Sequence, residues 1–205
     1  AYVLDDNFVA MLGDTGSNSM YTDTYTGGLK ARGNYMITAD PYSQFSEYVT
    51  WGYWEISYED PESAAQYHLH LPGDFWIAGE LTPASVIQDL AMNNIQGSYA
   101  GGAKGICINT LSEVSELTGG VSQIQVDFGT YQVSGNITFD QVNLELDSGI
   151  VYASSPQLSA GILGAGTSLV NGAFFGPNAN AIGGNFDADM SGTRYMGIFG
   201  GSRVP

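Results

Sequence analysis

The clearest pattern in the chain is a strict alternation of apolar and polar residues between positions 123 and 139. Apolar residues occupy the even positions from Ile124 to Phe128, and polar residues occupy the odd positions. After a Gly129-Thr130 turn, apolar residues from Tyr131 to Phe139 alternate with polar ones again. Successive side chains of a strand point to opposite faces, so this segment predicts a β-hairpin with one apolar face.

Most of the remaining chain shows the same strand period, interrupted by one helical segment. Turns rich in Gly, Asn, Asp and Pro separate the strand candidates, which is typical of a β-sandwich or barrel. Thr82 could cap a helix, Pro83 suits its first position, and apolar residues follow at helical spacing to about Met92. We expect this helix to plug or cross the barrel. The further strand candidates are 48–58, 67–81, 97–109, 142–152, 167–176, 181–187 and 194–200.

The first 45 residues are read as a separate β-rich extension, followed by a barrel domain over 46–205. Residues 1–12 are largely apolar, and such a cluster is seldom left in water. We therefore expect the extension to pack on its own barrel or on a neighbouring one. The candidate strand 48–58 has large residues on both faces, with Trp51 and Tyr53 on one of them. Since a barrel wall has one solvated face, these two residues mark either the packing site of the extension or a partner surface.

Composition narrows the classes of partner. The formal net charge is −16, with 5 Lys+Arg against 21 Asp+Glu, which argues against nucleic acid and anionic lipid. A hydrophobic content of 43% is too high for a disordered chain. No apolar run approaches the length of a membrane-spanning helix. Cys107 is the single cysteine and precludes an internal disulfide. A start at Ala1, few lysines and 28 glycines favour a mature or excised piece of an exported protein.

The last third of the chain carries a specific pattern of glycines and aromatic residues. It runs Gly-Ala-Phe-Phe-Gly-Pro-Asn-Ala over 172–179, Gly-Gly-Asn-Phe over 183–186 and Gly-Ile-Phe-Gly-Gly over 197–201. Preceding it, Val-Asp-Phe-Gly at 126–129 and Ser-Gly-Asn-Ile at 134–137 form the hairpin described above. Glycines among aromatic residues suit a strongly curved sheet, because large rings can cover them across strands.

This pattern resembles the C-terminal β-barrel of transferrin-binding-protein-type surface lipoproteins of Gram-negative bacteria. Three upstream motifs resemble the opening strands of that barrel: Trp-Gly-Tyr-Trp at 51–54, Trp-Ile-Ala-Gly at 76–79 and Tyr-Ala-Gly-Gly at 99–102. The resemblance covers about 47–203 and implies an all-β, up-and-down antiparallel barrel of about eight strands in a bacterial surface or extracellular setting. The large handle domain of that family is missing from the resemblance. Nothing in the resemblance implies transferrin itself as the ligand.

Four glycines of these motifs are expected to be structural. Gly135, Gly172, Gly183 and Gly197 stand where a curved sheet or a close aromatic contact should tolerate no side chain.

Acidic motifs suggest two chemistries, and neither is complete. Asp14-Thr15-Gly16 is an aspartic-protease signature, which needs a second carboxylate to share one proton. Asp147-Ser148-Gly149 is the candidate, but the segment before the next Ile-Leu-Gly at 162–164 is too short for the required lobe. A calcium loop starting at Asp187 would need Glu at its twelfth position, where the chain has Ile198. We therefore expect no enzyme and no calcium requirement, and read 187–192 as a hairpin turn.

The two histidines, His68 and His70, share one face of a candidate strand. They could bind haem iron or another metal, although two ligands without a third make a weak site. Solvated surface histidines are the commoner state.

Taken together, these patterns favour a non-catalytic, cell-surface binding module for a protein or small ligand, without a cofactor. Trp51, Tyr53, His68 and His70 are its candidate binding residues. The first alternative is a structural subunit of a surface fibre or adhesin, in which residues 1–12 add a strand to a neighbouring copy. The minor alternative is haem capture through His68 and His70.

Overall fold

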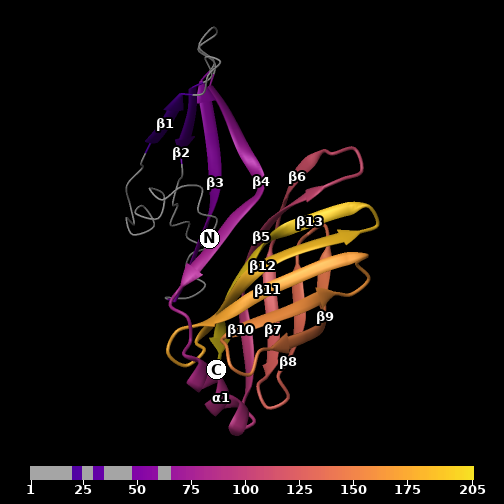
Figure 1. Cartoon of the computed structure of the whole chain (residues 1–205). Helices are drawn as coiled ribbons and strands as arrows, with labels where there is room; N and C mark the ends of the chain where they lie inside the picture. Colours follow the sequence, from indigo (N-terminus) through magenta and orange to yellow (C-terminus); the bar gives the residue numbers. More distant parts are fainter. Residues whose placement is uncertain (1–19, 25–29, 35–47, 60–65) are drawn as a thin grey trace. The chain divides into compact units, whose positions relative to one another are not determined.

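A computed structural model gives the structure of the chain and describes residues 20–24, 30–34, 48–59 and 66–205 (Figure 1). The described chain forms two compact units. One contains a four-stranded sheet in the order β1-β2-β3-β4. The other contains residues 48–50 and everything from 77 onward. The strands of the sheet are β1 (Met20–Thr24), β2 (Lys30–Asn34), β3 (Val49–Glu59) and β4 (Gln66–Gly79).

The second unit is a closed antiparallel barrel. From β7 to β13 each barrel strand pairs with the next along the chain, β7 also pairs with β5, and β13 closes the barrel by pairing with β5. The long strand β5 pairs with β7 along its first half and with β6 along its last four residues. The strands β6 and β7 therefore lie one after the other along the same side of β5. The strands are β5 (Gln96–Ile108), β6 (Val114–Leu117), β7 (Val121–Asp127), β8 (Gln132–Thr138), β9 (Asn143–Val151), β10 (Gln157–Ile162), β11 (Thr167–Phe175), β12 (Ala181–Met190) and β13 (Thr193–Val204).

The eight-stranded up-and-down barrel and its short helix confirm the predicted fold class. One detail of the prediction is wrong. The candidate strands at 48–58 and 67–81 do form strands, but they belong to the sheet with β1 and β2, and the barrel starts only at Gln96. Alternation along a segment predicts a strand, whereas the choice of neighbour depends on contacts far away in the chain. The proposed domain boundary at residue 45 lies outside the described residues and stays a prediction.

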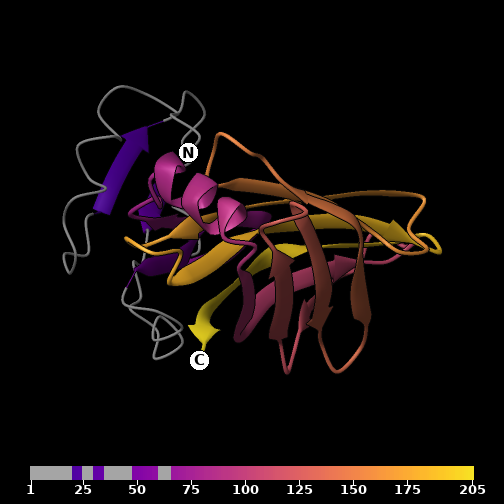
Figure 2. The same ribbon diagram turned by 90° about the horizontal axis from the view of Figure 1, so that it is seen from below.

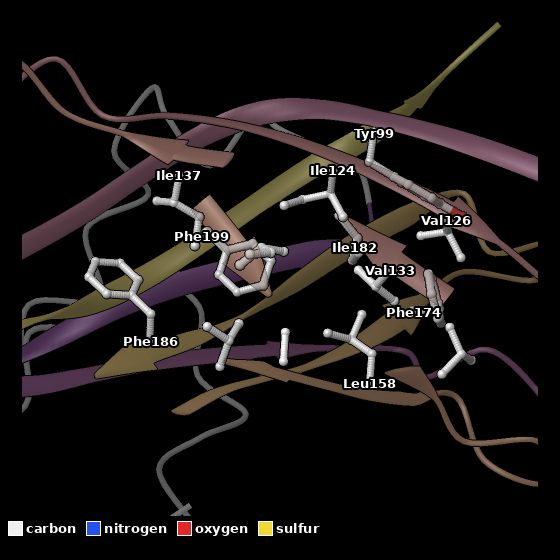
Figure 3. Close-up of a cluster of buried hydrophobic side chains, with 14 of the residues drawn as sticks. Tyr99, Ile124, Val126, Val133, Ile137, Leu158, Phe174, Ile182, Phe186 and Phe199 are labelled. Carbon is white, nitrogen blue, oxygen red and sulfur yellow. The ribbon is translucent and has the colours of Figure 1, made fainter. Parts of the chain in front are cut away.

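Buried side chains of the barrel strands fill its interior. Burial alternates along β7, where Ser122, Ile124 and Val126 point inward and their neighbours are exposed. Figure 3 shows side chains from several strands of the wall gathered in the interior, among them Ile124, Phe174 and Phe199. Phe174 lies with its ring centroid 5.2 Å from Phe128 and 5.8 Å from Tyr99. The barrel is therefore a packed core, in keeping with the size of an eight-stranded barrel.

The helix α1 (Ala84–Met92) lies at the end of the barrel where β5 begins, and Figure 2 views the molecule from that end. Ile87 and Ala91 are buried within the same core cluster, so the helix acts as a plug. The expected cap is absent, because Pro83 is the N-cap residue and makes no side-chain cap. The Thr82 hydroxyl instead donates to the carbonyl of Gly176 over 2.7 Å. Thr82 thus ties the start of the helix to the corner that follows β11.

A second, smaller apolar cluster lies on the outside of the barrel. Phe175 and Ala181 alternate with inward residues of β11 and β12, so they face away from the core. Val49 packs against them, with Tyr48 and Ile77 half-buried at its margin. The first residues of β3 and the last residues of β4 are therefore fixed on the outer wall of the barrel.

Candidate functional site

The structure brings the four predicted binding residues onto two adjacent strands. Trp51 and Tyr53 lie on β3, and His68 and His70 lie on its neighbour β4. Trp51 keeps only 6% of its surface exposed, and its indole Nε1 has no hydrogen-bond partner within the described chain. The structure describes the backbone of Tyr53, His68 and His70 but not their side chains. Their role in binding remains a prediction.

The carboxylates singled out for protease chemistry do not form a described pair. Asp14 lies outside the described residues. Asp147 is exposed on β9, where the Ser148 hydroxyl donates to its Oδ1 over 3.2 Å. Within the parts of the chain that the structure describes, no three His, Cys, Asp or Glu side chains gather closely enough to hold a metal ion.

The acidic segment 187–192 is a hairpin, as predicted. β12 ends at Met190, and Ser191 and Gly192 turn the chain into β13 with positive φ angles of 54° and 80°. The Arg194 guanidinium donates to the Asp187 carboxylate, with 2.9 Å between Nε and Oδ1. This hydrogen bond, together with the carboxylate charge, raises the pKa of Arg194. The carboxylate of Asp187 is thus used in an ion pair across the hairpin.

The four predicted glycines stand at tight places in the wall. A β-carbon on Gly135 would overlap the Gln123 carbonyl, and one on Gly197 would overlap the Lys104 carbonyl. At Gly172 the nearest atom would be a backbone oxygen at 2.9 Å. At Gly183 it would be the flexible tip of Ile77. These distances support a structural role, which remains to be measured.

Sequence reasoning missed the apolar residues at the end of the barrel opposite α1. Leu111, in the turn between β5 and β6, has 76% of its surface exposed, and Leu163, in the turn after β10, has 53%. Val114 on β6 is exposed at 49%. Single apolar residues in turns carry no periodicity, so only the folded wall shows that they share one end of the barrel.

The described part of the molecule is defined by a filled interior and by an outer surface with exposed apolar turns. A filled barrel cannot enclose a ligand, so this class of barrel offers only its wall and loops to other molecules. The nine-residue α1 is much too short to span a bilayer, and the described residues contain no membrane-spanning helix.

The family of this barrel follows from comparison with known proteins. The family model for the C-lobe and N-lobe beta barrels of Tf-binding protein B matches residues 90–203, which is more than half of the chain. The chain therefore belongs to this family. The matched range begins in α1 and covers the barrel strands up to the last residue but one of β13. No curated protein matches the chain.

Several solved structures share the fold at low sequence identity. Intact Ap-TbpB, with its N and C lobes, superposes with a TM-score of 0.54 at 15% identity, over 92% of this chain and 39% of that one. Isotype 1 transferrin binding protein B from serogroup B Neisseria meningitidis gives 0.54 at 17%, over 94% and 36%. The vaccine antigen transferrin binding protein B from Haemophilus parasuis Hp5 gives 0.54 at 16%, over 93% and 38%. The chain thus spans less than two fifths of these relatives.

Proposed function

We propose that this chain is a non-catalytic binding module of the bacterial cell surface whose ligand is a protein. The filled barrel carries the proposal, because a core made of the barrel's own side chains leaves only the outer surface for recognition. Family membership supports it, since the similar solved proteins are named transferrin binding proteins. A protein ligand also suits the exposed apolar turns at Leu111 and Leu163, because apolar side chains gain most when a partner covers them.

The proposed binding region includes the strands β3 and β4. It carries the aromatic residue Tyr53 and the two histidines on neighbouring strands, a combination suited to a protein interface. Trp51 is buried, so we assign it to packing that supports the strand rather than to direct contact.

Transferrin is the first ligand to test, because it appears in the names of the relatives. The purified chain is immobilised, and iron-loaded and iron-free transferrin are applied in a concentration series. We expect saturable binding that is weakened about tenfold when Tyr53 and His70 are both replaced by Ala. Tyr152→Ala is the control, because Tyr152 is an exposed tyrosine of the barrel unit, directly after β9.

Two results would contradict the proposal at different levels. A natively melting chain that binds neither form of transferrin removes transferrin as the ligand. Peptide hydrolysis that is lost in Asp147→Asn would overturn the non-catalytic proposal itself.

A further inference from the structure

Strand β6 has one open edge. Of the barrel strands in the described chain, every other one pairs on both sides, whereas β6 (Val114–Leu117) pairs with β5 alone. Figure 1 shows β6 and its turn at the end of the barrel opposite α1. An unpaired strand edge is a template for the backbone of another extended segment.

The register identifies the backbone groups that face outward. The Asn109 N–H donates to the Glu113 carbonyl over 3.1 Å, so these two residues form a hydrogen-bonded pair of the β5–β6 ladder. Hydrogen-bonded and non-hydrogen-bonded pairs alternate in an antiparallel ladder. Val114 and Glu116 therefore turn their N–H and C=O groups away from β5. Neither residue has a backbone partner on that side within the described chain.

The open stretch of the β6 edge ends at Thr118. The carbonyl of Thr118, which faces the same way as those of Val114 and Glu116, accepts a hydrogen bond from the Asp140 N–H over 2.9 Å. The edge is thus closed from Thr118 onward and open over Val114–Glu116. This stretch presents two backbone N–H donors and two backbone C=O acceptors, those of Val114 and Glu116, to an added strand.

The side chains beside the open edge are apolar and acidic. Val114 is directly opposite Ile108, and Glu116 is opposite Ile106, with both isoleucines half-buried on the outer wall. Glu113, Glu116 and Asp140 are all exposed here. Arg194 pairs in register with Ile108, but its guanidinium is held by Asp187.

We propose that the open edge of β6 receives an extended cationic segment of a partner protein as an added antiparallel strand. This inference rests on the proposed function as a protein-binding module and specifies one mode of binding. Val114 and Glu116 share one face of β6, and Glu113 lies on the other. The apolar side chains of the added strand would extend the Val114–Ile108 surface, and the Lys or Arg side chains on its opposite face would lie near Glu113. A second copy fits less well, since each chain carries a net charge of −16 and the same carboxylates would meet.

The probe is a short fluorescent peptide in which lysine alternates with valine, titrated into the full chain at low salt. We expect saturable binding that weakens as salt is added, because exposed charges are screened. A matched peptide with glutamate in place of lysine should bind at least about tenfold more weakly. Equal binding of the two peptides would overturn the assignment of a cationic partner.

A pair of variants tests the backbone edge. Val114→Pro removes an outward N–H that the β5 ladder does not use, and edge strands tolerate proline at such positions. Val114→Thr keeps both the N–H and the branched shape. We expect about tenfold weaker peptide binding for Val114→Pro and unchanged binding for Val114→Thr. Unchanged binding of the proline variant would overturn the proposal.

Amide hydrogen exchange provides a second readout if the proline variant fails to fold. In the wild-type chain the peptide should slow exchange at Val114 and Glu116, and no slowing at either amide would overturn the proposal. A concentration-dependent dimer that Val114→Pro abolishes would assign the edge to a second copy instead. Faster exchange of the Val114 and Glu116 amides after deletion of Ala1–Gly13 would show that the chain's own N-terminal segment occupies the β6 edge.

Transferrin binding of the same variants separates the two proposals. Saturable transferrin binding together with no peptide effect at β6 would contradict this inference alone. Peptide binding at β6 in a chain that binds no transferrin would leave the edge assignment standing without that ligand.

Discussion

Tyr99 is the largest fully buried side chain of the barrel and links its wall to the corner after β11. Its phenol donates to the carbonyl of Ala179 over 2.9 Å. Ala179 itself is buried with a positive φ of 52° and directly follows the Gly-Pro-Asn turn. Burial raises the pKa of Tyr99 strongly, and the charge of Arg203 opposes this only in part.

The raised pKa of Tyr99 makes stability depend on alkaline pH. A tyrosine in the unfolded chain ionises near pH 10.0, whereas the folded Tyr99 phenol stays protonated. The contribution of Tyr99 to the free energy of unfolding is therefore complete below pH 10 and is lost as the pH rises further. Tyr99→Phe should cost about 1 kcal/mol at pH 8, through the lost hydrogen bond. The wild type should lose about 1.4 kcal/mol for each pH unit above 10 at this residue, so the two chains should converge near pH 11. Urea unfolding at both pH values measures the difference, and a constant gap would contradict the prediction.

The four predicted glycines should differ in their sensitivity to valine. Gly135 has a φ of 134° and faces the Gln123 carbonyl, and Gly197 faces the Lys104 carbonyl, so valine there should cost several kcal/mol, roughly 3 or more. Gly172 should be intermediate. Gly183 should be the mildest, because it meets the movable tip of Ile77.

Thermal melting of the four valine variants measures this order. Gly166→Val is the matched control, because the nearest atom to a β-carbon there lies 3.9 Å away. Normal melting of all four variants would mean that these glycines do not shape the barrel.

At the scale of elements, strands were easier to predict than their partners. The hairpin of β7 and β8 has the expected turn and face, with Val126 opposite Val133. The helix was also predicted correctly, but its first turn is secured by Thr82 and the corner at Gly176 rather than by a side-chain cap. Local periodicity is a property of one segment, whereas the hydrogen bond from Thr82 to Gly176 joins residues that are 94 positions apart. No local pattern can predict it.

The N-terminal segment is the element whose packing is still a prediction. We expect residues 1–12 to pack on β3 near Trp51 and Tyr53, in their own chain or in a neighbouring one, because an apolar cluster of this size is stabilised by burial. Deletion of Ala1–Gly13 should lower the melting temperature of a dilute monomer if the contact is within the chain. It should abolish oligomers or fibres without changing that melting temperature if the contact is between chains.

Melting curves and size-exclusion chromatography of the deletion variant distinguish these cases. A deletion with neither effect, together with rapid proteolysis of the segment in the intact protein, would contradict the docking prediction.

At the scale of the whole molecule, the filled core and the acidic surface together limit the classes of ligand that the chain could bind. In residues 77–205 of the barrel unit, ten exposed or half-exposed carboxylates compare with three basic side chains, Lys104, Arg194 and Arg203. A negative surface of this kind recruits positively charged partners over short distances at physiological salt. The barrel therefore suits a protein ligand with basic patches better than an anionic one.

Haem is the small ligand to exclude. Titration of the full chain with haem should give no Soret band that depends on the histidines, because two imidazoles without a further ligand hold a metal weakly. The His68→Ala/His70→Ala variant is the comparison. A saturable band in the wild type that this variant loses would favour haem capture over protein binding.

The sequence alone determined that this chain is built from strands, that one short helix interrupts them, and which family its closing strands resemble. These features are encoded locally, in a period of two residues and in glycines placed among aromatic residues. The tertiary structure decided which strands pair. It placed β3 and β4 in a separate sheet, ended the β6 ladder at an open edge, and brought Leu111 and Leu163 to one end of the barrel. Pairing and surface clustering depend on contacts between residues that are distant in the chain, and no local pattern records them.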